Sequence, residues 1–450
     1  MRLQPVAIDV RLFRRLIVSG DGAEVTRVAS ALSNGDLAEI LLELAPAELS
    51  RLEQHLGVER IADAVAELDP SEAARLLVRV SRAEAADILE EMEPDDATDV
   101  VEELGEEAER ILAEMEVTEA SEIRDLLTYP SATAGGRMTP RFVSIRPDLT
   151  VGAAMRLLRA QAPDAETIYY IYVTDHEDHL VGVVSLRQLV VADPQQRIEA
   201  LLRPDVIRVP AEIDQEDVAR LLMDHDLLAL PVVDEEERLL GVITADDVAD
   251  VLQEEATEDI ERLGGSQPLG EPYLQASPFL LFRKRIVWLL FLFLGALQTS
   301  TILQAFSDEL SSFVALSFFI PLLVSTGGNA GSQVVTTVIR AMAVGEVRFR
   351  DVWVVLRREL LVGLLVGGVM GLATLLRAQT MHVDAHVAIT AGLAATAIVV
   401  WATAVAALLP IGLRRLRLDP AVMSAPLIAT LVDGTGLLIY LLIAKNVLGL

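Results

Sequence analysis

The sequence predicts a multidomain protein with an all-α N-terminal repeat, an α/β region built by internal duplication, and an α-helical region that crosses a membrane five times. Hydrophobic residues make up 52% of the 450 residues, yet the formal net charge is −30. The charge is confined to one part of the chain, because residues 1–270 hold 58 acids and 24 bases, whereas the rest hold 9 acids and 13 bases. Such a chain combines an acidic half with an apolar half.

The composition of the acidic half restricts its partners. An excess of negative charge of this size repels nucleic acid and attracts cations, although a solubilising surface is the alternative interpretation. The chain has no cysteine, which excludes disulfides and thiolate metal sites. Residues 1–16 contain several arginines and no apolar stretch of signal-peptide length, so we expect this half to stay in the cytoplasm.

Prolines recur every 24 residues in the first part of the chain, at Pro46, Pro70 and Pro94. Each stands two residues after a Leu or Met and two residues before an acid. Between the prolines, Ala, Leu and Val recur at helical spacing. Asp69 before Pro70 is typical of a helix cap with proline in the first turn. The pattern predicts a solenoid of short helices over about residues 20–128.

After a linker at Leu126–Pro140, residues 138–252 alternate between strand and helix patterns and contain a duplication. Met138-Thr-Pro140 matches Leu202-Arg-Pro204, and Tyr172-Val-Thr-Asp175 matches Pro231-Val-Val-Asp234. Each copy predicts a β-α-β-β-α unit. At these residues the chain resembles a tandem pair of CBS domains.

The resemblance to CBS pairs implies a place for a nucleotide. Such pairs often bind adenosine compounds through a Thr-x-x-Asp motif whose acid holds the ribose. The second copy has this motif from Thr244 to Asp247, whereas the first copy has Gln188 in place of the acid. We therefore expect at most one nucleotide site, with ATP as the candidate ligand.

Five apolar runs after residue 280 are long enough to cross a bilayer, which requires about 20 residues each. The third is the shortest and is rich in glycine. Basic residues cluster before the first run, between the second and third, and between the fourth and fifth, which places the N-terminus in the cytoplasm and the C-terminus outside. The runs cover about residues 284–306, 312–340, 357–377, 385–411 and 423–448.

The fifth span contains an acid, Asp433, followed by glycines. A charge at this depth is costly, and no basic residue lies within a helical turn or two along the sequence. We therefore expect Asp433 to face a water-filled path or a cation. A protonated carboxyl, or one bonded to a neighbouring helix, is the structural alternative.

The second span holds Pro321 followed by Gly327, Asn329, Gly331 and Gln333. We expect proline and glycine to break the helix, which the membrane tolerates only against protein or a water-lined cavity. The freed carbonyls, with Asn329 and Gln333, would offer the hard oxygen ligands that suit Mg²⁺ or Ca²⁺. The alternative is a packing face of the Gly-x-x-x-Gly type.

A helix expected at about residues 244–264 connects the two halves. Asp247, Asp250, Glu254 and Glu258 are spaced to lie on one face of this helix, where like charges repel. A solvated acidic face is the alternative. This helix leads to the basic residues before the first span, which is a suitable place for a gate. We expect facing acidic surfaces to repel each other without divalent ions and to close around the ions when they bind. Such an element has two states whose balance depends on the ion, as a sensor requires.

The order of these parts resembles the MgtE family of magnesium channels over essentially the whole chain. The matching motifs are Pro321…Gly327-Gly-Asn-Ala-Gly331-Ser-Gln333 and Asp419-Pro420…Pro426-Leu-Ile-Ala-Thr430-Leu-Val-Asp433-Gly-Thr-Gly436. The resemblance implies a homodimer in the plasma (inner) membrane, with a Mg²⁺ pore between subunits that cytosolic Mg²⁺ closes. The expected domains are the helical repeat at 1–130, the CBS pair at 131–252, the connecting helix at 244–275 and the pore domain at 276–450.

The resemblance also implies roles for individual residues. Asp433 would hold a hydrated Mg²⁺, flanked by Ala429 and Gly436, with Gly328 and Asn329 also in the pore. The chain departs from the family at Ala425, where Asn is frequent, so the pore's ligand shell is expected to differ in detail. The regulatory Mg²⁺ ligands would be Glu59, Glu91, Asp95, Asp214, Glu216, Asp226, Asp247, Asp250, Glu255, Glu258, Asp259 and Asp419.

Two other classes of function remain open at this stage. One is a CBS-regulated transporter for another divalent cation, such as Co²⁺ or Mn²⁺, or an anion channel, which would need bases or helix N-termini within the spans. The other is a nucleotide-sensing membrane enzyme. No phosphate loop or pair of nucleophile and base is recognisable in the sequence, so we expect passive transport and no enzyme activity.

Overall fold

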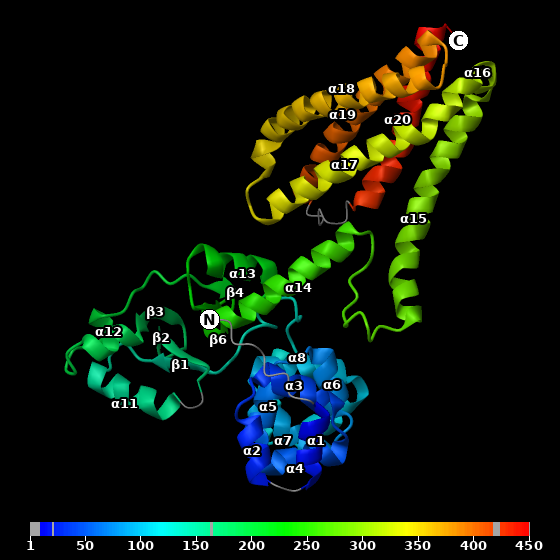
Figure 1. The fold of residues 1–450 in the computed structure, drawn as a ribbon. Helices are drawn as coiled ribbons and strands as arrows, with labels where there is room; N and C mark the ends of the chain where they lie inside the picture. Colours follow the sequence, from blue (N-terminus) through cyan, green and yellow to red (C-terminus); the bar gives the residue numbers. More distant parts are fainter. Residues whose placement is uncertain (1–9, 20–21, 163–164, 417–423, 450) are drawn as a thin grey trace. The chain divides into compact units, whose positions relative to one another are not determined.

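The computed structural model describes residues 10–19, 22–162, 165–416 and 424–449 (Figure 1). The chain divides into two compact units, Met1–Gln253 and Glu254–Leu450. Each unit has hydrophobic cores of its own. The acidic half and the apolar half predicted from the sequence therefore correspond closely to separate compact parts of the molecule.

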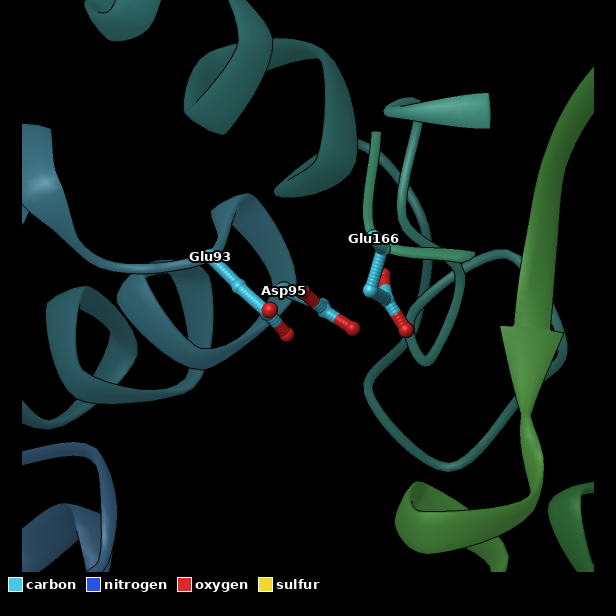
Figure 2. Close-up of side chains that lie close together, drawn as sticks. All are labelled: Glu93, Asp95 and Glu166. Atoms are coloured by element: carbon cyan, nitrogen blue, oxygen red, sulfur yellow. The ribbon is translucent and has the colours of Figure 1, made fainter. Parts of the chain in front are cut away.

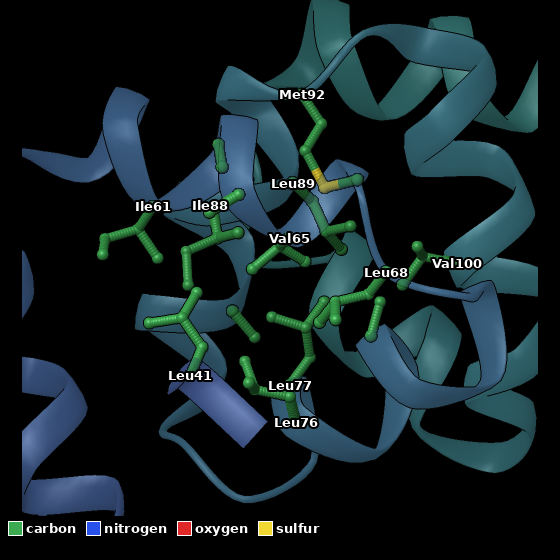
Figure 3. Close-up of a cluster of buried hydrophobic side chains, with 14 of the residues drawn as sticks. Leu41, Ile61, Val65, Leu68, Leu76, Leu77, Ile88, Leu89, Met92 and Val100 are labelled. Carbon is green, nitrogen blue, oxygen red and sulfur yellow. The ribbon is translucent and has the colours of Figure 1, made fainter. Parts of the chain in front are cut away.

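The first unit begins with a series of short helices. Pro46, Pro70 and Pro94 each occupy the first position of a helix, where proline's missing N–H costs nothing. Asp69 caps its helix by accepting the Ser71 N–H at 3.0 Å. Leucine, isoleucine, valine and alanine side chains from successive helices share one core (Figure 3). The helices are α1 Val10–Ser19, α2 Gly22–Ala29, α3 Asn34–Glu43, α4 Pro46–Leu56, α5 Val58–Ala66, α6 Pro70–Leu77, α7 Arg82–Glu91, α8 Pro94–Leu104, α9 Ala108–Leu112 and α10 Val117–Leu126.

The duplicated region forms two three-stranded sheets, and each copy has the predicted β-α-β-β-α order. In each sheet the first two strands are parallel and the last two antiparallel. The first copy contains β1 Phe142–Ile145, α11 Val151–Gln161, β2 Thr167–Thr174, β3 Leu180–Ser185 and α12 Leu186–Val191. The second contains β4 Val209–Pro210, α13 Gln215–Asp224, β5 Ala229–Val233, β6 Leu239–Thr244 and α14 Ala245–Leu263.

The two copies exchange the segments that precede their first strands. Thr139, which leads into the first copy, pairs with Val242 on β6 of the second copy through backbone hydrogen bonds of 2.8 and 3.0 Å. Arg203, which leads into the second copy, pairs with Val183 on β3 of the first copy through two bonds of 3.0 Å. Each copy's sheet is therefore extended by backbone from the other copy.

The expected linker before the CBS pair is a fixed part of the structure. The Ala134 and Gly135 N–H groups donate to backbone carbonyls before α13, each at 2.8 Å. The Arg137 guanidinium lies 2.7 Å from Asp99 on α8 and 2.9 Å from Gln215 on α13. The helical repeat and the second CBS copy are thus joined by an ion pair and by backbone hydrogen bonds.

The second unit contains five helical segments that are long and apolar enough to span a membrane, among the described residues. This confirms the predicted number of spans. The third, expected over residues 357–377, extends over 32 residues because residues 349–356 before it and 378–380 after it continue the helical segment. The segments are α15 Pro278–Ala305, Val314–Ala343 with α17 Ile320–Ala343, Phe349–Thr380 with α18 Val352–Thr380, α19 Ala385–Arg415 and α20 Ala425–Leu448; the short α16 covers Ser307–Ser312.

The expected break in the second span is wrong. α17 is one continuous helix, with Pro321 in its first turn, where proline is tolerated. A Cβ at Gly327 would lie 2.6 Å from Ile398 on α19, and one at Gly331 would lie 2.7 Å from Ile428 on α20. These glycines form a close helix-packing face, which is the alternative that the sequence left open.

The glycines of the third span also allow close packing against a neighbouring helix. Gly363, Gly367 and Gly371 are buried against α19, at intervals of four residues. The Thr396 hydroxyl donates to the Gly367 carbonyl at 2.9 Å, a contact that only a residue without a side chain permits. Glycine therefore marks the buried side of α18 and not a weak helix.

Candidate ion-binding sites

The first candidate site is a cluster of carboxylates in the first unit (Figure 2). Oxygens of Glu93, Asp95 and Glu166 lie within 4.8 Å of one another, and oxygens of Glu166, Asp246 and Asp247 do so as well. Glu166 belongs to both groups. We call these five residues the acidic cluster.

Glu93 and Asp95 come from the N-terminus of α8. Glu93 is the N-cap residue and makes no capping hydrogen bond with its side chain, so its carboxylate extends beyond the helix. Asp95 follows Pro94 in the first turn and is only 7% exposed. The partial positive charge of a helix N-terminus favours anionic groups at both positions.

The other members of the cluster come from the CBS pair. Glu166 directly precedes β2, and Thr139 and Thr244 hydrogen-bond to its carboxylate. Asp246 and Asp247 begin α14, with the Thr244 hydroxyl 2.5 Å from Asp246 Oδ1 and 2.6 Å from Asp247 Oδ2. The exchanged segment thus brings the Thr139 hydroxyl of one copy and the Thr244 hydroxyl of the other to the same carboxylate.

The cluster has more negative charge than its surroundings balance. Burial, together with Asp247 and Glu166, raises the pKa of Asp95 well above its usual range. Burial, Asp247 and Glu93 raise the pKa of Glu166 to about 8. The pKa of Asp247 is also raised by burial, and Arg141 partly offsets the rise at Glu93. A proton or a cation would relieve this repulsion.

Two oxygens of the cluster have no hydrogen-bond partner among the described residues. They are Asp95 Oδ1 and Glu166 Oε2, and both are buried. Leaving a buried carboxylate oxygen without a partner costs about 1–3 kcal/mol or more. The atoms of this cluster that could coordinate a metal ion are all carboxylate and hydroxyl oxygens, which are the ligands that Mg²⁺ and Ca²⁺ prefer. The residues therefore fit a hard divalent cation.

The second candidate site is Asp433 on α20 in the membrane unit. A Cβ placed at Gly328 on α17 would lie 3.4 Å from Ala429 Cβ and 3.5 Å from Asp433 Oδ1. Gly328, Ala429 and Asp433 are therefore neighbours on the contact between α17 and α20. Gly436, by contrast, packs against Ile398 on α19, on another side of α20.

α17 exposes a polar row beside this site. Ser325, Asn329 and Gln333 are exposed and recur every four residues, and Thr336 and Arg340 continue the row. The opposite side of α17 is buried in the core of the unit. Exposed amides and hydroxyls are costly against lipid. This face requires either water or another polypeptide.

The structure does not bring all predicted ligands together. Asp95 and Asp247 belong to the acidic cluster, and Asp250 is close enough to Asp247 to raise its pKa. The other predicted acids in the described residues do not belong to the cluster. Glu216 pairs with Arg220 at 2.6 Å, and Glu258 pairs with Arg262. Asp419 lies outside the described residues. The exposed positions are Glu59, Glu91, Asp214, Asp226 and Asp250, and Glu255 and Asp259 are half-buried on α14.

The acid of the Thr-x-x-Asp motif makes hydrogen bonds to the threonine of the same motif. Asp247 Oδ2 accepts the Thr244 N–H at 3.1 Å and also lies beside the Thr244 hydroxyl. In the first copy, Gln188 Oε1 takes the same place and accepts the Ser185 N–H at 3.0 Å. Both residues thus cap a helix, but only Asp247 retains a charge for a ribose or a cation.

Glu93, Glu166 and Asp246 were missed by the sequence analysis. Glu93 occupies the cap position that Ala45 and Asp69 hold in earlier repeats, which is a signal that could have been used. No sequence signal identifies Glu166, because its role depends on the exchange of segments between the CBS copies.

Comparison with known proteins gives a consistent result for the helical repeat, the duplicated region and most of the membrane region. Residues 32–132 match the MgtE intracellular N domain, residues 134–194 and 198–254 match CBS domains, and residues 320–443 match the MgtE divalent cation transporter family. The magnesium transporter MgtE of Thermus thermophilus is 47% identical over 330 residues, which is 73% of this chain and 73% of that protein. The chain belongs to the MgtE family.

Further members of the MgtE family are also similar. The magnesium transporter MgtE of Enterococcus faecalis is 38% identical over 327 residues, which cover 73% of this chain and 72% of that protein. The crystal structure of the soluble part of a magnesium transporter matches with a TM-score of 0.52 at 37% identity, covering 55% of this chain and 98% of that one. The cytosolic domain of the Mg²⁺ channel MgtE in complex with ATP matches with a TM-score of 0.51 at 37% identity, covering 54% and 99%. The predicted family and fold class are confirmed.

Proposed function

We propose that the protein carries Mg²⁺ across the membrane down its electrochemical gradient, past the carboxylate of Asp433. The observation that carries this proposal is a half-buried acid in a membrane span whose carboxylate receives no ion pair or hydrogen bond from the described residues. Lys445, on the same helix, pairs instead with Glu309 at 3.3 Å. A permeating dication would stabilise such a carboxylate.

The pore is proposed to lie between two copies of the chain. One chain leaves the polar row of α17 exposed and places it beside Asp433, so a second copy facing it would enclose a polar path. Mg²⁺ sheds its water reluctantly, and the amides and hydroxyls of this row suit contacts with a hydrated ion. A membrane potential of 100 mV alone would supply about 4.6 kcal/mol for each divalent ion, from about 2.3 per charge.

We propose that the acidic cluster senses cytosolic Mg²⁺. Without the ion, its carboxylates repel one another across the contact between α8 and the CBS pair. With the ion, the two sides are held together, which gives two states whose populations depend on Mg²⁺. The acids of α14 continue from this cluster along the connecting helix. Basic residues at the ends of the spans support a cytoplasmic N-terminus and an outer C-terminus.

The transport proposal is tested by flux into liposomes containing the purified chain, with Mg²⁺, Co²⁺, Mn²⁺, Ca²⁺ and chloride compared. We expect Mg²⁺ flux that Asp433→Ala abolishes, while the variant keeps the oligomeric state of the wild type on a sizing column. Unchanged Mg²⁺ flux and selectivity in the folded variant would remove Asp433 from the pore. A larger flux of another ion would replace Mg²⁺ as the substrate.

The sensor proposal is tested by patch recordings with varied cytoplasmic Mg²⁺. Neutralising Asp247, Asp250 and Glu258 together should leave the channel open at concentrations that close the wild type. The matched control is Asp214→Asn with Asp226→Asn, which removes exposed charges outside both the acidic cluster and α14. Retained closure in the triple variant would show that Asp247 and the acids after it on α14 take no part in closing the channel.

We further propose that ATP and the regulatory ion compete for Asp247. A relative's cytosolic domain has been solved with ATP, and in this chain Asp247 is the motif acid that retains a charge. The same carboxylate belongs to the acidic cluster, so ribose and cation cannot both use it fully. Isothermal titration of the chain with ATP, at low and high Mg²⁺, should show weaker binding at high Mg²⁺ and none in Asp247→Asn. Equal binding in all three would contradict the competition.

A further inference from the structure

A cavity of about 640 Å³ lies at the junction of α14 and α15, apart from both candidate ion sites. Its lining comes from the end of α14, the loop that follows, and the first turns of α15. The lining is mainly apolar, through Val287, Trp288 and Pro268, but it also contains Arg262 and Lys284. With Glu258 included, the charged side chains of the cavity sum to one positive charge.

The cavity is held in shape by specific contacts. The Lys284 ammonium donates to the Pro268 carbonyl, and the Gln267 N–H donates to the Lys284 carbonyl at 3.2 Å, so the loop is fixed to α15. The Trp288 indole N–H donates to the Ser424 hydroxyl at 3.2 Å. Gly265 has a φ of +75°, and a Cβ there would lie 2.8 Å from the indole, so glycine allows the backbone to approach the ring.

The position of the cavity along α15 corresponds to the surface of a bilayer. Arg283, Lys284 and Arg285 are the last charged residues before a long apolar stretch of α15, in which exposed apolar side chains follow from Val287 onward. Leu292 is the one buried residue of α15, whose residues 278–305 are all described, so most of this helix is exposed to lipid or to another subunit. Arginine, lysine and tryptophan are typical of the headgroup level.

We propose that this cavity binds one anionic phospholipid, such as phosphatidylglycerol. Lys284 and Arg262 hold the phosphate, and Val287 and Trp288 contact the upper part of an acyl chain. The Pro268 carbonyl uses only one of the three N–H donors of the Lys284 ammonium group. The Arg262 guanidinium has five donors and also pairs with Glu258. The single net positive charge matches a headgroup with one negative charge. The apolar lining favours a phosphate that is attached to a hydrocarbon chain over a free phosphate ion.

Lipid retention by the full-length purified chain tests this site. The chain is equilibrated in mixed micelles of phosphatidylglycerol and phosphatidylcholine, and the lipids retained per chain are measured by native mass spectrometry. We expect one phosphatidylglycerol per chain, retained in preference to phosphatidylcholine, and not displaced by 10 mM inorganic phosphate. Lys284→Gln should weaken retention by about 20-fold, because a charged hydrogen bond is lost. The glutamine can still donate to the Pro268 carbonyl, so the loop stays in place.

The matched control is Arg285→Gln, which removes the same charge from an exposed neighbour outside the cavity. Its effect should be at most about fivefold, which is the general attraction of one surface charge to an anionic membrane. Lys284→Arg should restore retention. Equal losses in the two glutamine variants, equal retention of phosphatidylcholine, displacement by inorganic phosphate, or no retained lipid in the wild type would each overturn the proposal. These outcomes do not depend on which ion the protein carries.

Discussion

The acidic cluster of the first unit and Asp433 of the second use the same chemical group in opposite ways. The cluster crowds Glu93, Asp95 and Glu166 within 4.8 Å, with Asp246 and Asp247 adjoining. Asp433 is a single carboxylate between α17 and α20, with small residues around it. Crowded carboxylates favour a bound cation or a proton, because either relieves their repulsion. One carboxylate beside glycine and alanine leaves room for an ion that keeps its water and leaves again.

We propose that the number of carboxylates at a site separates the proposed sensor from the proposed pore. A sensor requires a bound state that persists, and a pore requires binding weak enough for the ion to leave. The same distinction predicts different responses to removing one carboxylate. Loss of one acid from five should shift an affinity, whereas loss of the single acid should remove the function.

The largest effect is therefore expected for Asp433→Asn. An amide keeps the size of the side chain but loses its charge, so we expect Mg²⁺ flux in liposomes to fall by about two orders of magnitude. Asp384→Asn, which changes an exposed helix cap outside the membrane core, should leave the flux within a factor of two or so of the wild type. Comparable losses of flux in the two variants would contradict a specific role for Asp433 in the pore.

A pair of neighbouring glycines should separate packing from permeation. A Cβ at Gly327 would meet Ile398 at 2.6 Å, so Gly327→Ala should destabilise the membrane unit by about 1–3 kcal/mol. A Cβ at Gly328 has only ordinary contacts, so Gly328→Ala should retain stability but alter flux past Asp433. Thermal unfolding in detergent and liposome flux measure the two effects. The reverse pattern would show that Gly328 packs and Gly327 borders the pore.

A smaller effect is expected for Glu166→Gln. The amide removes one of five negative charges and keeps acceptor and donor atoms for Thr139 and Thr244. We expect the Mg²⁺ concentration for half-closure to rise about tenfold in patch recordings, which corresponds to about 1.4 kcal/mol. Glu109→Gln, at an exposed pair with Arg124, is the control. No difference between these variants would exclude Glu166 from the sensor.

The smallest effect concerns pH in the absence of divalent ions. Asp96 follows Asp95 in the first turn of α8. Because the folded state raises the pKa of Glu166 to about 8 and that of Asp96 to about 7, it holds protons that the unfolded chain releases near pH 4. The stability contributed by these protonated acids is fully present below pH 4 and is lost as pH rises towards 8. We expect the unfolding temperature of the first unit to fall by a few degrees between pH 5 and 8. Mg²⁺ should abolish this fall, and a fall that persists at saturating Mg²⁺ would contradict it.

Periodic patterns predicted the fold well. The 24-residue spacing of prolines placed the starts of α4, α6 and α8, because proline suits only the first turn of a helix. The duplication predicted both CBS copies, and the apolar runs predicted five spans. Glycine was misinterpreted on α17, since a sequence does not show whether glycine breaks a helix or allows a second helix to approach.

The candidate sites were predicted less completely than the fold. Asp247 and Asp433 stand in sequence motifs, and the resemblance to the MgtE family implied a role for Asp95. Glu166 was not identified from the sequence, because it meets Asp95 only after the helical repeat has docked on the exchanged CBS segments. Contacts between residues far apart in the sequence leave no periodic signal, so such a site can be recognised only in the folded structure.

The exchange of Thr139 and Arg203 between the CBS copies has a consequence for cooperativity. The segment before the first strand of each copy, at Thr139 or Arg203, pairs with the edge of the sheet in the opposite copy. Without that segment the edge is exposed, so neither copy is a complete folding module. A disturbance that begins at Thr244 is transmitted directly, through backbone bonds from Val242 to Thr139, to the entrance of the neighbouring copy. The two CBS copies should therefore unfold in one cooperative transition, and a ligand that binds to one copy should also stabilise the other.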